Sequence, residues 1–172
     1  GNIVDIASPY DYFYNSEVAG GSCKLAFQKE LIGKEDYDTL LYLWKNNMKY
    51  LKEGSFSYIH GSAFLWNIYL SKENGSWEVC RLDNLKDARW FDPAFDEALI
   101  LYPYFSMNDE SISGAFFNGY GSMPDRKRIT LFLMVQILSE AVRSLEIPNR
   151  YFDVMQIKNS IFKLKLLLRK IK

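Results

Sequence analysis

The side chains that could do chemistry are concentrated in residues 60–96. The candidate groups of this stretch are one imidazole, one hydroxyl, one amide and two carboxylates: His60, Ser62, Asn67, Asp83 and Asp87. His60 is the chain's single histidine, which excludes multi-histidine metal sites and any serine nucleophile activated by another histidine. Cys23 and Cys80 form no CxxC pair, which argues against a disulfide scaffold or a structural zinc site. The remaining chemistry is that of oxygen ligands and carboxylates.

The order of motifs in this stretch resembles the aminoglycoside and choline phosphotransferase family, small-molecule kinases with a protein-kinase-like fold. The family's catalytic loop reads His-Gly-Asp, four residues and Asn, and here His60-Gly61-Ser62 precedes Asn67 at that spacing. A hairpin and a metal-binding Asp follow in the family, and then Gly-Asp-Pro-x-x-Asp. This chain has a predicted hairpin and then Asp92-Pro93-Ala94-Phe95-Asp96. The resemblance covers residues 35–145.

The resemblance implies a role for each matching residue of the loop. Phosphoryl transfer depends on positioning and charge neutralisation, so the loop needs a proton acceptor and oxygen ligands for magnesium. Position 62 corresponds to the catalytic Asp, which accepts the proton of the acceptor hydroxyl, and Asn67 corresponds to a magnesium ligand. His60 corresponds to a residue that shapes the loop. Asp92 and Asp96 correspond to the element that braces it.

The second metal ligand depends on the register of the alignment. Counting back from Asp96 without a gap gives Asn84, and a one-residue insertion gives Asp83 instead. The gap-free register makes both essential carboxylates neutral, since position 62 is already Ser62. In either register, a kinase-like loop requires Ser62, Asn67 and one of these two residues to converge beside the hairpin.

Two departures from the family bear on activity. Ser62 replaces the catalytic Asp, and a hydroxyl is no base near neutral pH, whereas a general base contributes about 10²- to 10⁴-fold to the rate. Residues 1–55 contain no glycine-rich loop followed by a strand lysine, so the nucleotide-binding N-terminal lobe is absent from this sequence. We therefore expect residues 1–172 to form a single kinase-like C-terminal lobe.

The expected function is that of a degenerate, pseudokinase-like lobe, a binding or scaffold module without phosphotransfer by this chain. One alternative is part of an active kinase that uses ATP and Mg²⁺ to phosphorylate an amino sugar, a choline-like compound or a sugar. Asp83 or Asp87 would then supply the lost charge, and the N-terminal lobe would belong to a longer parent chain from which this sequence is truncated. A second alternative is an unrelated helical interaction domain. Whether the chain is an enzyme is therefore open at this point.

The elements that must position these groups are mostly helices with a small β hairpin. Ser8-Pro9 starts a first helix, and Ser22 is expected to cap another over 24–31. Pro103 is expected to end a helix that begins at Asp92-Pro93. Strands are expected over 56–60, 67–70 and 77–82, with an Asn-Gly turn joining the last two. Further helices are expected over 35–52, 109–117, 125–145 and 157–172.

The composition limits the classes of partner that the chain is expected to bind. The 172 residues carry 21 basic and 21 acidic side chains. Because the net charge is zero, the composition gives no electrostatic reason to expect nucleic-acid binding. The longest apolar stretch is too short to cross a bilayer, and no signal peptide is visible. Two free thiols favour a reducing, cytoplasmic setting. The partner classes that remain are a small molecule or a protein.

The last predicted helix, 157–172, carries six basic residues and no acidic one. It is either a membrane-surface or acidic-partner helix, or a terminal helix packed on the domain with its lysines solvated. The four tryptophans are expected to pack in the interior, and Cys80, in a predicted strand, to be buried.

Overall fold

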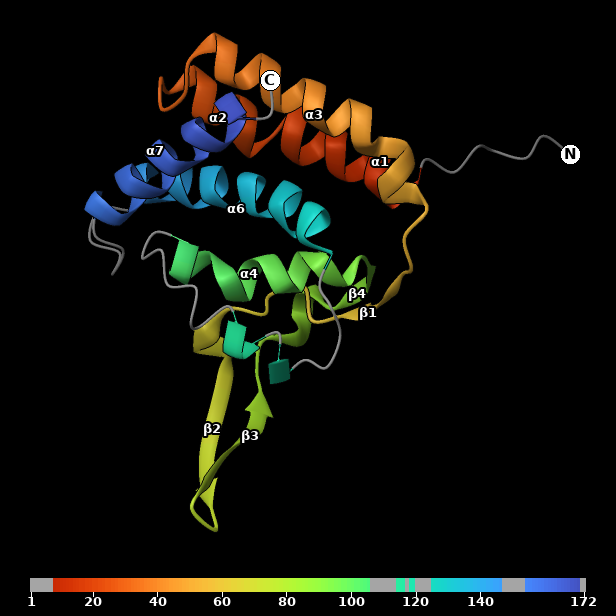
Figure 1. The fold of residues 1–172 in the computed structure, drawn as a ribbon, viewed down its shortest axis with the longest axis vertical. Coiled ribbons are helices and arrows are strands. Elements are labelled where there is room, and N and C mark those ends of the chain that lie inside the picture. Colours follow the sequence, from red (N-terminus) through yellow and green to blue (C-terminus); the bar gives the residue numbers. More distant parts are fainter. Residues whose placement is uncertain (1–7, 106–113, 117, 120–124, 147–153, 171–172) are drawn as a thin grey trace, which may run out of the picture. The chain divides into compact units, whose positions relative to one another are not determined.

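The computed structural model describes residues 8–105, 114–116, 118–119, 125–146 and 154–170. The chain divides into two compact units, one made of Gly1–Gly54 with Met134–Lys172 and the other of Ser55–Leu133. The described residues are mostly helical and include two antiparallel two-stranded sheets (Figure 1). The predicted class, mostly α with a small β hairpin, is confirmed. No helix among the described residues has the length and apolar character needed to span a bilayer.

The first unit is a helical bundle. Its elements are α1 (Pro9–Phe13), the π-helical turn η1 (Tyr14–Ala19), α2 (Ser22–Gln28), α3 (Lys34–Lys52), the C-terminal part of α6 (Arg126–Glu146) and α7 (Val154–Lys170). Its core is formed by side chains from all the long helices: Tyr10, Leu40, Trp44, Leu51, Leu138, Leu164 and Leu168. The helix predicted over 35–52 is confirmed, as are those over 125–145 and 157–172 with small changes at their ends.

Local capping explains where the first helices begin. The Ser8 hydroxyl accepts from the Tyr10 amide, the Asp11 carboxylate accepts from the Ser8 amide, and Pro9 occupies the first helical position. The prediction that Ser22 caps α2 is wrong. Ser22 is the first residue inside α2, and its hydroxyl donates to the Glu17 carboxylate instead.

The second unit holds both sheets. Its elements are β1 (Ser57–Ile59), the 3₁₀ turn η2 (Leu65–Asn67), β2 (Ile68–Glu73), β3 (Ser76–Leu82), the 3₁₀ turn η3 (Leu85–Asp87), β4 (Arg89–Phe91), α4 (Pro93–Phe105) and the first turns of α6. β1 pairs with β4, a three-residue strand that the sequence did not predict, and α4 contacts β1. Edge-to-face contacts among Phe91, Phe95 and Phe132 join β4, α4 and α6.

Pro103 does not end its helix as predicted, since α4 runs from Pro93 to Phe105 with Pro103 inside it. The proline lies in the last turn, where the missing backbone donor removes only one hydrogen bond near the helix end. The helix predicted over 109–117 falls mostly on residues outside those that the structure describes.

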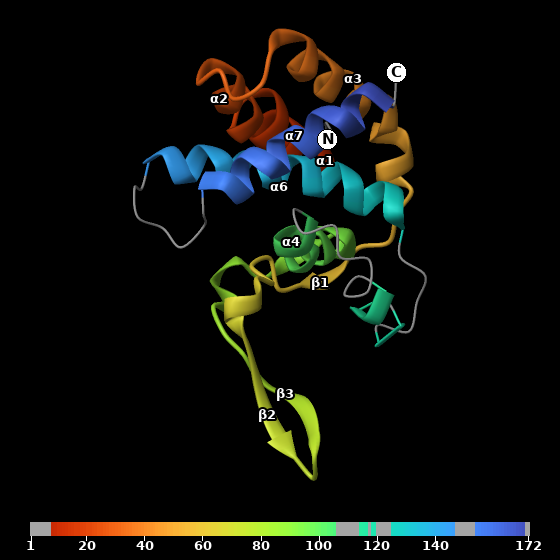
Figure 2. The ribbon, with the colours of Figure 1, turned by 60° about the vertical axis from the view of Figure 1, so that its left-hand side comes forward.

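The predicted hairpin is confirmed, and it extends away from β1, β4 and α4 (Figure 2). Asn74 and Gly75 both have positive φ, as a tight hairpin turn requires. A bulge in β3 opposite Tyr69 and Leu70 shifts the alternation by one residue. As a result, one face carries the apolar cross-strand pairs Ile68–Leu82 and Leu70–Val79.

Exposed side chains overturn two expectations about the interior. Trp77 is 68% exposed on this hairpin, and Trp66 and Trp90 are also exposed, so only Trp44 packs in the core as predicted. Cys80 is exposed rather than buried, whereas Cys23 is buried. Burial raises the pKa of the Cys23 thiol above its usual range, which keeps it protonated.

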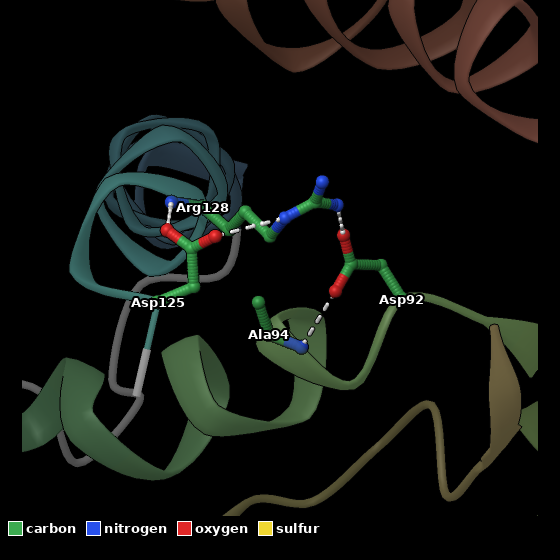
Figure 3. Close-up of polar contacts among 4 residues, drawn as sticks. All are labelled: Asp92, Ala94, Asp125 and Arg128. Atoms are coloured by element: carbon green, nitrogen blue, oxygen red, sulfur yellow. Dashed lines mark hydrogen bonds and ion pairs between the residues drawn. The ribbon is translucent and has the colours of Figure 1, made fainter. Parts of the chain in front are cut away.

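A buried ion pair joins the start of α4 to the start of α6 (Figure 3). The Arg128 guanidinium donates to Asp92 Oδ2 at 2.7 Å through Nη1 and to Asp125 Oδ2 at 3.0 Å through Nε. Asp92 Oδ1 accepts from the Ala94 amide at 3.0 Å, as a helix cap does. The side chains of Arg128 and Asp92 are only 9% and 3% exposed, so each charge depends on the other.

We expect Arg128→Met to lower the free energy of unfolding by about 3–5 kcal/mol, because it leaves the Asp92 carboxylate buried without its cation. Urea denaturation of Arg128→Met, of Asp92→Asn and of the double variant Asp92→Asn/Arg128→Met measures the coupling. The double variant is expected to be more stable than Arg128→Met alone. Additive losses would show that the two charges do not interact.

Candidate functional site

The loop that carries the predicted catalytic residues is held by one carboxylate. Asp96, in the first turns of α4, accepts from the His60 amide at 2.7 Å through Oδ2 and from the Gly61 amide at 2.9 Å through Oδ1. Both oxygens therefore bind consecutive backbone donors directly after β1. This two-point contact, which we call the Asp96 clamp, fixes the direction in which the chain leaves the strand.

Gly61 is required at its position for two reasons. Its φ of +76° lies in the left-handed region, which side chains rarely adopt. A Cβ there would also lie 2.1 Å from the backbone oxygen of Asp87, well inside van der Waals contact. The backbone of the loop therefore packs directly against η3, and this close approach brings Asp87 to the site.

Ser62 is turned toward Asp87 and is almost fully buried. Its hydroxyl donates to Asp87 Oδ2 at 2.5 Å, and its amide donates to His60 Nδ1 at 3.2 Å. Nδ1 of His60 accepts this hydrogen bond, and the other ring nitrogen, Nε2, is buried with no hydrogen-bond partner among the described residues. Ser62 itself is only 6% exposed, so its hydroxyl is a donor inside the protein.

Asn67 closes the loop onto the base of the hairpin. Its Nδ2 donates to the Ser62 carbonyl oxygen at 2.7 Å, and its own carbonyl accepts from the Asp83 amide at 2.9 Å. β2 begins at the next residue after Asn67, and β3 ends at the residue before Asp83. Ser62 and Asp83 thus both bind Asn67 beside the hairpin, Ser62 through its carbonyl oxygen and Asp83 through its amide.

The two candidate metal ligands after the hairpin are both exposed. The Asp83 carboxylate forms an exposed ion pair with Arg81 at 2.9 Å. Asn84 has a φ of +62° and precedes η3, where a left-handed residue reverses the chain. The Asp92 carboxylate binds Arg128 and the start of α4. The Asp96 carboxylate binds the loop backbone.

Asp87 and Arg128 are the interacting residues to which the motif pattern assigned no place in the site. The sequence offered Asp87 only as an alternative source of charge in the active-kinase hypothesis, and its contact with Ser62 was not predicted. Arg128 had a signal in the sequence, because Asp125 three residues before it marks a helix start with an i, i+3 charge pair.

The described residues do not fit a carboxylate-rich magnesium site. They contain no group of three His, Cys, Asp or Glu side chains placed to hold a metal ion. Asn67 is 8% exposed with its amide nitrogen bound to the loop, and Asp83 is paired with Arg81. Magnesium prefers several oxygen ligands with at least one or two carboxylates, which this arrangement does not offer.

A cavity of about 240 Å³ adjoins the loop. His60 and Asp96 contribute to its wall, together with Ile68 and Leu82, the first apolar pair of the hairpin. Side chains of the loop, the hairpin and α4 thus meet around one hollow, and the backbone of the loop is its most constrained part.

The charge of Asp96 is balanced between opposing influences. Burial is the largest one and raises the pKa of Asp96 above its ordinary value of 3.8. The two amide donors and the nearby positive charge of Arg89 act in the opposite direction. A carboxyl whose pKa is raised in the folded state contributes stability below its ordinary pKa. That contribution is lost as the pH rises through the raised value.

We expect the Asp96 carboxyl to titrate above 3.8 in a ¹³C NMR titration. Arg89→Met should raise this midpoint further, because it removes a cation that favours the charged form. Arg81→Met, which removes a cation of the hairpin, serves as the control and should leave the midpoint unchanged. A midpoint that falls in Arg89→Met would contradict the balance described.

We expect Gly61→Ala to destabilise the protein more than Gly75→Ala does. Both glycines have positive φ, so each substitution carries about 1–3 kcal/mol of backbone strain. Only at position 61 does the new methyl group also meet a backbone atom, since nothing lies within 4 Å of a Cβ at position 75. Urea denaturation of the two variants measures the difference, and equal losses would show that the contact with Asp87 is not tight.

The chain matches no family model, no curated protein and no solved structure in the comparisons made. The resemblance to the aminoglycoside and choline phosphotransferase family therefore stays a prediction from the order and spacing of the loop residues.

Proposed function

We propose that this chain is a kinase-like C-terminal lobe of degenerate type, which binds a small hydroxylated amine or sugar at Asp87 and does not transfer phosphate. The observation that carries the proposal is the hydrogen bond from the Ser62 hydroxyl to the Asp87 carboxylate. At the position where the resemblance expects a proton acceptor, this chain has a buried proton donor.

Burial supports the same conclusion. A general base must lie within hydrogen-bond reach of the substrate hydroxyl. Ser62 and Asn67 are 6% and 8% exposed, and both are turned toward the loop itself. Asp87 is partly exposed and is the carboxylate closest to them in the hydrogen-bond network. It is therefore the group best placed to bind the hydroxyl or ammonium groups of a ligand.

One observation favours a second candidate, an active kinase in which Asp87 replaces the missing base. Its carboxylate oxygen lies 2.5 Å from the hydroxyl of Ser62, close to where the family's catalytic Asp would be. Such an enzyme would need ATP and Mg²⁺, and the described residues do not fit a magnesium site. For this reason we place binding first.

The test is a titration of the ¹⁵N-labelled chain with a panel of hydroxylated amines and sugars, followed by a phosphotransfer assay with ATP and Mg²⁺. We expect at least one member of the panel to shift the amide resonances of residues 60–67 and 83–87, and no member to be phosphorylated. Asp87→Asn should weaken binding about tenfold or more, since a hydrogen bond to a charged group contributes about 1.5–3 kcal/mol.

Asp83→Asn is the matched control. It removes a carboxylate of the same segment that is already paired with Arg81, so binding should be unchanged. Turnover that Asp87→Asn abolishes would establish the second candidate instead. A panel that leaves these resonances unmoved would overturn the binding proposal and leave the chain as a helical interaction domain.

A further inference from the structure

The helix α7 presents two different faces. Its inner face is part of the core of the first unit, with Leu164 and Leu168 almost completely buried and Ile157, Ser160 and Ile161 also buried. α7 packs against α3, and Lys165 lies 3.9 Å from the Asp36 carboxylate of that helix. These contacts fix the rotation of α7 about its axis, and with it the residues that point outward.

The outer face of α7 carries an apolar pair between two basic residues. Phe162 is 62% exposed and Leu166 is 40% exposed, one helical turn apart. Lys158 lies one turn before Phe162 and Arg169 one turn after Leu166, and both are exposed. The stripe of these four residues, which we call the α7 stripe, is about 16 Å long, since an α-helix rises about 1.5 Å per residue.

The charge of α7 has one sign. Residues 154–170 contain five basic side chains and no acidic one. Basic residues at both ends of a short apolar pair match the layers of an anionic membrane interface. The apolar side chains can enter the acyl boundary while the long basic side chains reach back to the phosphates.

We infer that the α7 stripe binds the surface of membranes that contain anionic phospholipids. Phe162 and Leu166 insert at the boundary of the headgroups, and Lys158 and Arg169 pair with phosphate or carboxylate groups of the lipids. The inference does not depend on the proposed function, because it uses no residue of the loop. It also goes beyond the simpler alternative for this helix, that its lysines are merely solvated.

The experiment is flotation of the full chain with vesicles made of equal parts of phosphatidylserine and phosphatidylcholine, and with vesicles of phosphatidylcholine alone. We expect binding only to the anionic vesicles at about 0.1 M salt and release at about 1 M, where the Debye length falls from about 10 Å to about 3 Å. Lys158→Ala/Arg169→Ala should lower the partition coefficient about thirtyfold, as each basic residue contributes about fivefold at such a surface.

Matched controls come from exposed residues of α3. Lys45→Ala/Lys49→Ala removes two exposed cations outside the stripe and should leave binding unchanged. Phe162→Ser/Leu166→Ser should abolish insertion, whereas Tyr42→Ser, at a residue that is 64% exposed, should not. Circular dichroism checks that each variant is folded.

Three results would overturn the inference. They are no flotation with anionic vesicles, flotation that high salt leaves intact, and equal losses in the α3 controls. Binding of the chain to polyglutamate but not to vesicles would assign the stripe to an acidic protein instead, and would equally overturn it.

Discussion

The geometry of the candidate site depends on the Asp96 clamp. A strand that ends in solvent leaves its last backbone donors free to bind water, and the chain beyond it can then adopt many directions. Here both carboxylate oxygens of Asp96 bind the amides of His60 and Gly61, so two consecutive peptide units are fixed at once. Asp96 belongs to α4, whose start is itself anchored to α6 through Asp92 and Arg128. The position of the loop is therefore set by α4 and by the start of α6.

The contacts of Ser62 follow from that constraint. Once Gly61 adopts a positive φ against the backbone of Asp87, the next residue is directed at the Asp87 side chain. A carboxylate at position 62 would there face a second carboxylate, and two like charges at hydrogen-bond distance cannot both ionise readily. A hydroxyl avoids this repulsion by donating. Serine at position 62 and aspartate at position 87 are thus compatible as a pair, which is why we treat them together in the proposed function.

The sequence predicted those features that depend on local signals. The Ser8-Pro9 helix start and the Asn74-Gly75 turn are each encoded within a few residues, and the helix over 35–52 is encoded by the spacing of its apolar residues. The sequence missed β4, because three residues carry too little pattern, and it missed the contact of Asp87 with Ser62, because it joins residues 25 positions apart. The exposed tryptophans were missed for a different reason: alternation predicts an apolar face but not whether anything covers it.

The residues of the loop have two kinds of role, one in backbone geometry and one in the proton chemistry that the resemblance implies. Gly61, Asn67 and Asp96 act on backbone geometry, through a close approach, a bond to a carbonyl and a bond to two amides. Position 62 alone is the place where the resemblance requires proton chemistry. A change at any of the other three would alter the path of the chain, whereas the Ser62 side chain contributes the hydrogen bond to Asp87. The shape of the loop therefore depends on backbone contacts that the side chain at position 62 does not make.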